Sequence, residues 1–207
     1  MKYKFGFIGT GNMGGALARA IAEKTEPEEM LLANRTEEKA RILADELGCD
    51  YGTNADAAGE CRYIFLGVKP QGMAALAEDI SPVLAARGDR FILVTMAAGL
   101  STERISALFG GNIPVIRIMP NTPVAIGEGM ILCTANSLVT KEELAEFAEA
   151  MEYAGICDMI SEEKIDAASV ISGCGPAFMF MFISAFEEAG KALGLDGEKA
   201  RLYAEQT

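Results

Sequence analysis

Residues 2–24, KYKFGFIGTGNMGGALARAIAEK, decide the fold. The apolar run at their start predicts a buried strand, and the Ala-rich run at their end predicts a helix. Three glycines lie between the two. At this spacing Gly9 allows a tight turn, Gly11 lets the backbone approach a pyrophosphate, and Gly14 lets the helix pack close to the sheet. The stretch therefore predicts a dinucleotide-binding loop, with a Gly-rich turn that binds nothing as the alternative.

The chain continues the same alternation of strand and helix. Short apolar runs predict strands at residues 4–8, 30–33, 63–66, 91–95, 115–119 and 130–133. Amphipathic stretches predict helices at residues 13–23, 37–47, 73–86, 102–108 and 141–151. Because strands and helices alternate in this way, residues 1–160 are expected to form an α/β domain with a Rossmann-type doubly wound sheet.

From residue 161 onwards the pattern predicts helices only. They are expected at residues 162–172, 176–193 and from 196, with the first break at Gly173 and Gly175-Pro176, because proline suits the first turn of a helix. The stretch AFMFMFISAF, residues 177–186, is apolar nearly all round and must be covered on several sides. Residues 161–207 are therefore expected to form an incomplete helical domain for dimerisation and substrate binding, covered by a second subunit.

The second predicted strand indicates which dinucleotide is bound. An NAD-binding loop is usually followed, about 20 residues on, by a carboxylate that bonds the ribose 2′-hydroxyl. Here the strand ends at Asn34, Arg35 and Thr36, with no acid before Glu37. A guanidinium can pair with a 2′-phosphate, and the two neighbours can donate hydrogen bonds. The sequence thus favours NADP(H) over NAD(H), unless Arg35 is only a solvated charge at the strand end.

Composition excludes several classes of protein. The net charge of −12, from 30 acidic and 18 basic residues, argues against a nucleic-acid or anionic membrane surface. There is no histidine, and the five cysteines are widely spaced, so no metal site or disulfide framework is predicted. The N-terminus leads directly into a strand and no apolar run approaches the roughly 20 residues that span a bilayer, so a cytoplasmic protein is expected.

Several motifs together resemble one enzyme family. They are GFIGTGNMGGALA at residues 6–18, GVKPQ at 67–71, AAG at 97–99, MPNTP at 119–123 with GEG at 127–129, and EEKIDAASVISGCGPAF at 162–178. Through these motifs the sequence resembles Δ1-pyrroline-5-carboxylate reductase, and the resemblance extends from residue 5 to about residue 202. The resemblance implies hydride transfer from NAD(P)H to the C=N carbon of a cyclic imine, which gives L-proline in the last step of its biosynthesis.

The resemblance also implies roles for particular residues. Glu162 would lie near the substrate ring nitrogen, although an acid at this position also suits a helix N-terminus. Met119 and Asn121 would lie on the substrate side, and the helical segment would join two subunits into a dimer or a larger oligomer. The cofactor contacts implied are Gly9, Thr10, Gly11, Asn12, Met13, Gly14, Asn34, Arg35, Thr36, Asn54, Val68, Lys69, Pro70, Met96, Ala97 and Ala98.

The sequence departs from the family at its end. The family carries a further C-terminal segment with a Ser-Pro-Gly-Gly-Thr-Thr loop that grips the substrate carboxylate, and this sequence contains no such loop. A shortened chain is therefore expected, with the dinucleotide site present and turnover in doubt. Two alternatives follow: an enzyme like the 3-hydroxy-acid dehydrogenases, although no lysine is well placed for it, or a non-catalytic dinucleotide-binding protein.

Overall fold

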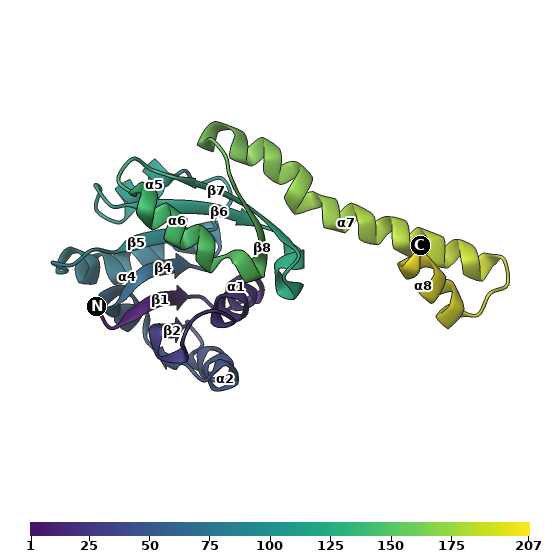
Figure 1. Cartoon of the computed structure of the whole chain (residues 1–207), viewed down its shortest axis with the longest axis horizontal. Helices are drawn as coiled ribbons and strands as arrows, with labels where there is room; N and C mark the ends of the chain where they lie inside the picture. Colours follow the sequence, from purple (N-terminus) through teal and green to yellow (C-terminus); the bar gives the residue numbers. More distant parts are fainter.

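A computed structural model describes all 207 residues as an α/β body from which one long helix projects (Figure 1). The strands are β1 Tyr3–Ile8, β2 Met30–Ala33, β3 Asp50–Gly52, β4 Cys61–Leu66, β5 Ile92–Thr95, β6 Val115–Pro120, β7 Gly129–Ala135 and β8 Gly155–Met159. The helices are α1 Asn12–Ala22, α2 Glu37–Leu47, α3 Asn54–Glu60, α4 Met73–Ala85, α5 Thr102–Leu108, α6 Lys141–Ala150, α7 Glu162–Ala192 and α8 Gly197–Gln206. Short 3₁₀ turns lie at Pro27–Glu29, Pro70–Gly72, Thr122–Ile126 and Glu152–Ala154.

All eight strands form one sheet in the order β3-β2-β1-β4-β5-β6-β7-β8. Neighbouring strands are parallel except for β6 and β7, which form an antiparallel pair. The order from β3 to β6 is that of the Rossmann fold, with the first βαβ unit at the centre of the sheet. The expected fold class, a Rossmann-type doubly wound sheet followed by a helical segment, is confirmed.

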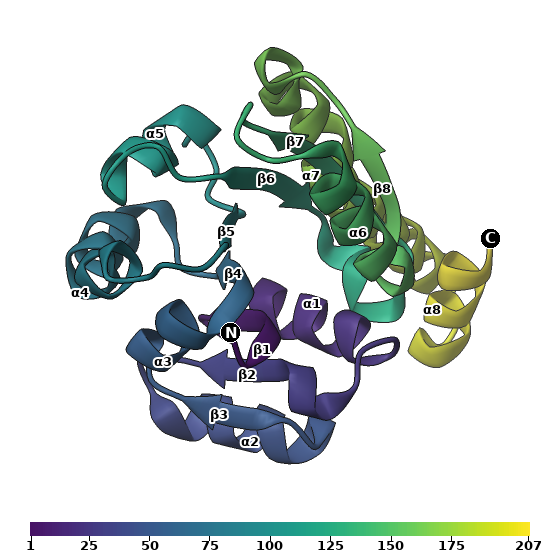
Figure 2. The ribbon, with the colours of Figure 1, turned by 60° about the vertical axis from the view of Figure 1, so that its left-hand side comes forward.

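Successive side chains of the central strands supply two separate cores, because alternate residues of a strand point to opposite faces. Phe7 and Phe65 stack on one face with ring centroids 4.4 Å apart, whereas Ile8 and Ile64 belong to the core on the other face. Helices α1, α2 and α6 cover the first face, and α3, α4 and α5 cover the second (Figure 2). The apolar runs in these strands thus reflect burial on both sides.

Three elements of the body were not expected from the sequence. Strands β3 and β8 are short and largely exposed edge strands, and they lack the apolar runs that mark the central strands. Helix α3 is capped by Thr53, whose side chain accepts a hydrogen bond from the Asp56 backbone N–H in a capping box. Edge strands of this kind are held by pairing with a neighbour rather than by burial, so apolar pattern alone does not reveal them.

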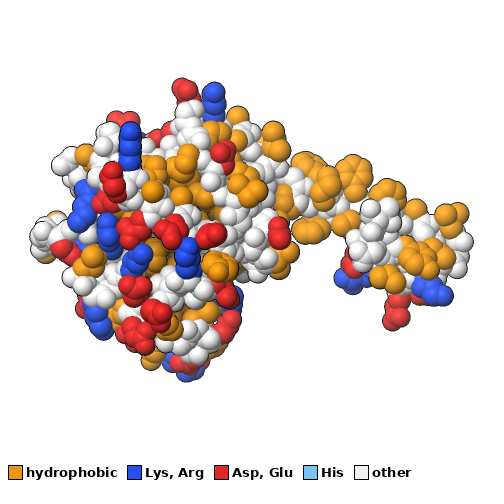
Figure 3. Space-filling view, in the orientation of Figure 1, with side chains coloured by type: hydrophobic (Ala, Val, Ile, Leu, Met, Phe, Trp, Pro, Cys, Tyr) orange, Lys and Arg blue, Asp and Glu red, His pale blue; other side chains and the backbone are white.

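The predicted break in the C-terminal helices is wrong. Helix α7 runs without interruption from Glu162 to Ala192, through Gly173, Gly175 and Pro176, and α8 folds back against its far end. Ile165 is the one buried residue of α7. The first part of α7 contacts β6 and β7, whereas its C-terminal part stands clear of the body, and apolar side chains cover that part in the space-filling view (Figures 1 and 3).

This continuous helix also corrects the expectation that no stretch reaches membrane-spanning length. By length and composition alone, α7 is long and apolar enough to cross a bilayer, and none of its apolar window is buried within the chain. A helix with an apolar surface needs a cover, which can be a lipid or another protein.

Candidate active site

The glycine-rich loop joins β1 to α1 by close contacts that no side chain would permit. Gly9 has a φ of +106°, which L-residues rarely adopt, and a Cβ on Gly14 would lie 2.1 Å from the Gly9 carbonyl oxygen. A Cβ on Gly11 would meet nothing within 4 Å. The glycines therefore differ in role: Gly9 and Gly14 hold the turn against the helix, and Gly11 leaves open space in front of the backbone.

The start of α1 is arranged to receive a polar ligand. Gly11 is the N-cap of the helix and no side chain caps it, so the first N–H groups have no side-chain partner. The Thr10 hydroxyl oxygen is buried and has no hydrogen-bond partner, while the Thr10 N–H donates to Asn34 Oδ1 at 3.2 Å. A helix N-terminus with free N–H groups is a favourable place for phosphate. These residues fit the pyrophosphate of a dinucleotide.

The end of β2 lies beside this loop, as the Thr10–Asn34 bond shows. Asn34 also donates through Nδ2 to the Thr36 carbonyl oxygen at 3.0 Å, which fixes the side chain between the two segments. Arg35 is exposed and forms no ion pair, and the Thr36 side chain makes no capping bond to α2. Arg35 and Thr36 thus have polar groups free for a ligand.

An apolar pocket of about 290 Å³ lies beyond the carboxyl ends of β4, β5 and β6. Ligands of open α/β sheets bind in this position. Most of the lining residues are predicted cofactor or substrate contacts, and the other two, Gly67 and Pro120, belong to the GVKPQ and MPNTP motifs. The lining residues are Met13, Gly67, Val68, Lys69, Pro70, Met96, Ala98, Met119 and Pro120.

Gly67 shows why the pocket meets the glycine loop. A Cβ on Gly67 would lie 2.3 Å from the Gly9 carbonyl oxygen, so the end of β4 and the turn after β1 are in direct backbone contact. The signal was present in the sequence, because Gly67 opens the GVKPQ motif. The motif gave no indication that this glycine packs against Gly9.

Other predicted residues lie outside the pocket lining. Ala97 is buried in the core on the second face of the sheet, with its N–H facing Thr95 Oγ1 at 3.3 Å. Asn54, at the start of α3, donates to Asp79 Oδ2 at 3.0 Å. Asn121 is 9% exposed and is engaged on both sides of its amide, as described below. Direct ligand contact by these residues stays a prediction.

Glu162 is held within the protein. Its carboxylate accepts two 2.7 Å hydrogen bonds from Thr102, one from the backbone N–H and one from the hydroxyl. It also lies 3.5 Å from the guanidinium of Arg117, whose side chain is 3% exposed and which pairs with Asp166 as well. These bonds join the starts of α5 and α7 to β6, and they support a structural role for Glu162.

Arg117 was not recognised from the sequence. It is a charged residue within an otherwise apolar strand, VIRIMP, and such residues are seldom fully buried unless paired. The partners of Arg117 come from α7, about fifty positions along the chain, where sequence spacing gives no hint of contact. The buried Nε of Arg117 has no partner.

Comparison with known proteins finds two family models that match parts of the chain. Residues 4–99 match the family model described as "NADP oxidoreductase coenzyme F420-dependent", and residues 162–207 match "Pyrroline-5-carboxylate reductase dimerisation". The pyrroline-5-carboxylate reductase of Corynebacterium melassecola is 34% identical over 199 residues, which are 95% of this chain and 74% of that protein.

Solved structures give the same result. The pyrroline-5-carboxylate reductase of Coxiella burnetii superposes with a TM-score of 0.88 at 28% identity, over 100% of this chain and 77% of that one. The pyrroline carboxylate reductase of Plasmodium falciparum, solved with NADP bound, superposes with a TM-score of 0.86 at 28% identity, over 99% and 75% of the two chains.

The fold and the loop define an oxidoreductase that depends on a nicotinamide dinucleotide. The relatives define the family more narrowly, because the similarity to them extends through the projecting helices as well as the sheet. The chain belongs to the pyrroline-5-carboxylate reductase family. The 3-hydroxy-acid dehydrogenase alternative is not favoured, and the dimerisation match over residues 162–207 supports oligomerisation.

Proposed function

We propose that this protein reduces 1-pyrroline-5-carboxylate to L-proline with a hydride from NAD(P)H. The observation that carries the proposal is the apolar pocket at the carboxyl ends of β4–β6, directly beside the glycine loop, in a chain of this family. Oligomerisation through α7 as a homodimer or a larger assembly, in the cytoplasm, is part of the proposal.

The dinucleotide, when bound, supplies the hydride. The N–H groups at the start of α1 would hold its pyrophosphate, and Met13, Met96 and Met119 would form an apolar wall around the reacting ring. A protonated imine is already electrophilic, so the protein needs chiefly to hold the reactants at contact distance and to exclude water. A pocket lined by apolar side chains, in a chain without histidine, suits that task.

NADP(H) is the favoured cofactor. The side chains of Arg35 and Thr36 form no hydrogen bond or ion pair within the chain, and they lie next to Asn34, which is bonded to the glycine loop. A 2′-phosphate on the ribose would take the unpaired guanidinium in forked geometry. Glu162 is proposed to position the start of α7, since Thr102 and Arg117 engage its carboxylate.

Two measurements test the proposal. NADPH oxidation that depends on added pyrroline carboxylate is expected, and no oxidation with 3-hydroxy acids and NADP. NADPH should bind tighter than NADH. The Arg35→Ala variant should bind NADPH about tenfold more weakly, because one charge-assisted contact is lost, and its affinity for NADH should not change. Arg41→Ala is the matched control, since Arg41 pairs with Glu38 and Asp45 on α2.

The outcomes separate the alternatives. NADPH binding without imine-dependent oxidation would support a non-catalytic dinucleotide-binding protein. Equal affinities for NADPH and NADH, unchanged by Arg35→Ala, would contradict the assignment of the 2′-phosphate site and leave the reaction itself in place.

A further inference from the structure

Pro176 lies inside α7 and should interrupt it. Proline has no N–H, so the carbonyl four positions earlier loses its helical partner. That carbonyl belongs to Ser172. In this structure Asn121 Nδ2 donates to the Ser172 carbonyl oxygen at 2.9 Å. A side chain from the loop after β6 thus supplies the hydrogen bond that the proline removes.

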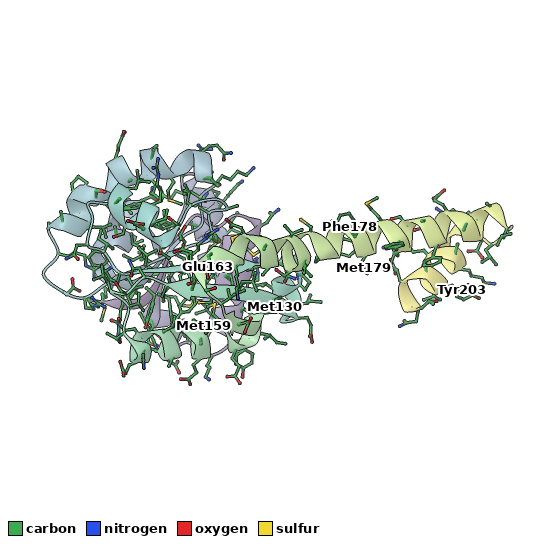
Figure 4. All side chains as sticks on the ribbon, turned by 90° about the horizontal axis from the view of Figure 1, so that it is seen from above. Met130, Met159, Glu163, Phe178, Met179 and Tyr203 are labelled. Atoms are coloured by element: carbon green, nitrogen blue, oxygen red, sulfur yellow. The ribbon has the colours of Figure 1, made fainter.

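The oxygen of the same amide is bonded to the backbone of β7. Asn121 Oδ1 accepts a hydrogen bond from the Met130 N–H, at the start of β7, at 2.8 Å. The side chain is 9% exposed, so water competes little for either bond. Figure 4 shows Met130 near the first half of α7, and α7 contacts both β6 and β7. One amide therefore joins three segments: the β6–β7 connection, β7 and the projecting helix.

Asn121 also adjoins the pocket. It follows Met119 and Pro120, which line the pocket wall at the end of β6. The resemblance placed Asn121 on the substrate side, but both of its hydrogen-bonding groups face backbone. A displacement of Asn121 would move the two wall residues that precede it and the helix that carries Ser172. The chemistry of the pocket and the direction of α7 are thereby linked through one side chain.

We infer that Asn121 is a positioning residue that replaces the N–H missing at Pro176 and keeps the pocket wall in register with α7. The replacement of the missing Pro176 N–H by Asn121 does not depend on the reaction that the protein catalyses. The expected effect of Asn121 on imine reduction rests on the proposed function. The inference predicts a specific energetic coupling between Asn121 and Pro176, two residues separated by 55 positions in the chain.

The test is a double-mutant cycle on the full chain. Asn121→Asp keeps the shape and the acceptor for Met130 but cannot donate when ionised, and Pro176→Ala restores a backbone N–H for Ser172. Asn136→Asp is the matched control, because Asn136 makes the same kind of bridge, from the Ile113 carbonyl at 2.9 Å to the Val115 N–H at 3.2 Å, without touching α7.

Urea unfolding at one fixed protein concentration is the first readout. Asn121→Asp should raise the unfolding equilibrium constant by about tenfold, and Asn136→Asp by a similar factor. Pro176→Ala should recover most of that loss in the Asn121→Asp background and little of it with Asn136→Asp, because only the first pair shares a partner. An equal effect of Pro176→Ala in all backgrounds would contradict the inference that Asn121 replaces the N–H missing at Pro176.

Kinetics are the second readout. Asn121→Asp should lower kcat for imine-dependent NADPH oxidation by about tenfold or more, since small displacements of a pocket wall are costly. The Kd for NADPH should change by less than about threefold, because the pyrophosphate loop is untouched. Pro176→Ala should restore kcat, and Asn136→Asp should leave it unchanged.

The remaining outcomes are also decisive. A kcat that falls equally in Asn136→Asp and Asn121→Asp would overturn the positioning role and leave only a contribution to stability. A wild-type chain that does not oxidise NADPH with the imine would contradict the proposed function, and the unfolding cycle would still decide whether Asn121 and Pro176 are coupled.

Discussion

At the scale of single residues, the site depends on backbone approaches that only glycine allows. The sequence showed Gly9, Gly11 and Gly14 at the spacing of a dinucleotide loop, and the structure gives Gly9 and Gly14 close backbone contacts and leaves open space at Gly11. Gly67 could not be assigned in the same way, because its contact with Gly9 crosses from β4 to β1. Spacing along the chain reports local turns, whereas contacts between strands appear only after the sheet forms.

The contact of Gly14 leads to a prediction. Gly14→Ala should lower the free energy of unfolding by about 1–3 kcal/mol, because the added methyl would overlap the Gly9 carbonyl and push α1 from the sheet. It should also weaken dinucleotide binding, because α1 carries the phosphate-facing N–H groups. Urea unfolding and titration with NADPH measure the two effects.

Two other glycines serve as comparisons. Gly11→Ala should weaken NADPH binding with a smaller loss of stability, since its Cβ would enter the open space in front of the loop. Gly88→Ala, which also meets nothing within 4 Å but lies far along the chain in the loop before β5, should change neither quantity. Equal binding by Gly11→Ala and the wild type would contradict a pyrophosphate at this loop.

At the scale of elements, local signals predicted most helices but missed helix α3, the two edge strands and the continuity of α7. The edge strands β3 and β8 lack apolar runs because little of either is buried. Helix α7 was divided at Pro176 because the proline signal is local, while its compensation by Asn121 comes from another part of the chain. The edge strands and the continuity of α7 were missed for one reason, because the partner that stabilises each of them is distant in sequence.

Helix α6 is attached to the loop before β5 by an ion pair with a measurable pH dependence. Arg90 donates to both Glu143 oxygens at 2.8 and 2.7 Å, and the Thr140 N–H donates to the same carboxylate at 2.9 Å. The Arg90 guanidinium lowers the pKa of Glu143 from 4.5 to about 2. Because the folded pKa is depressed, the stability from this group is present above pH 4.5 and is lost as the pH falls towards 2.

Unfolding measured between neutral pH and pH 2 should show this loss. Glu143→Gln should lower stability at neutral pH and flatten the acid limb of the curve, because the titrating group is gone. Glu142→Gln changes an exposed neighbour without an ion-pair partner and should leave the curve as in the wild type. An acid limb that is unchanged in Glu143→Gln would show that other carboxylates govern it.

At the scale of the whole molecule, an acidic α/β body carries an uncovered apolar helix. Figure 4 shows Phe178 and Met179 on the part of α7 that stands clear of the body, and Phe178 and Phe182 are among its exposed aromatic side chains. The charge of −12 and the apolar stretch at residues 177–186 were both visible in the sequence. The need for another surface to cover that stretch was visible as well. The direction in which α7 leaves the sheet was not visible, because buried Arg117 and Asn121 set it through contacts distant in sequence.

If another subunit covers α7, polar substitution on its exposed face should separate the subunits. Burying one large apolar side chain is worth about 1.5–3 kcal/mol, so Phe178→Glu with Phe182→Glu removes several kcal/mol from the interface and adds charges that must be desolvated. Sedimentation equilibrium should give an oligomer for the wild type and a monomer for the double variant. Ile42→Glu, at an exposed apolar residue of α2 on the body, should leave the oligomer intact. A wild-type chain that is monomeric in solution and co-sediments with lipid vesicles would instead show that lipid covers the helix, as its length and composition alone would allow.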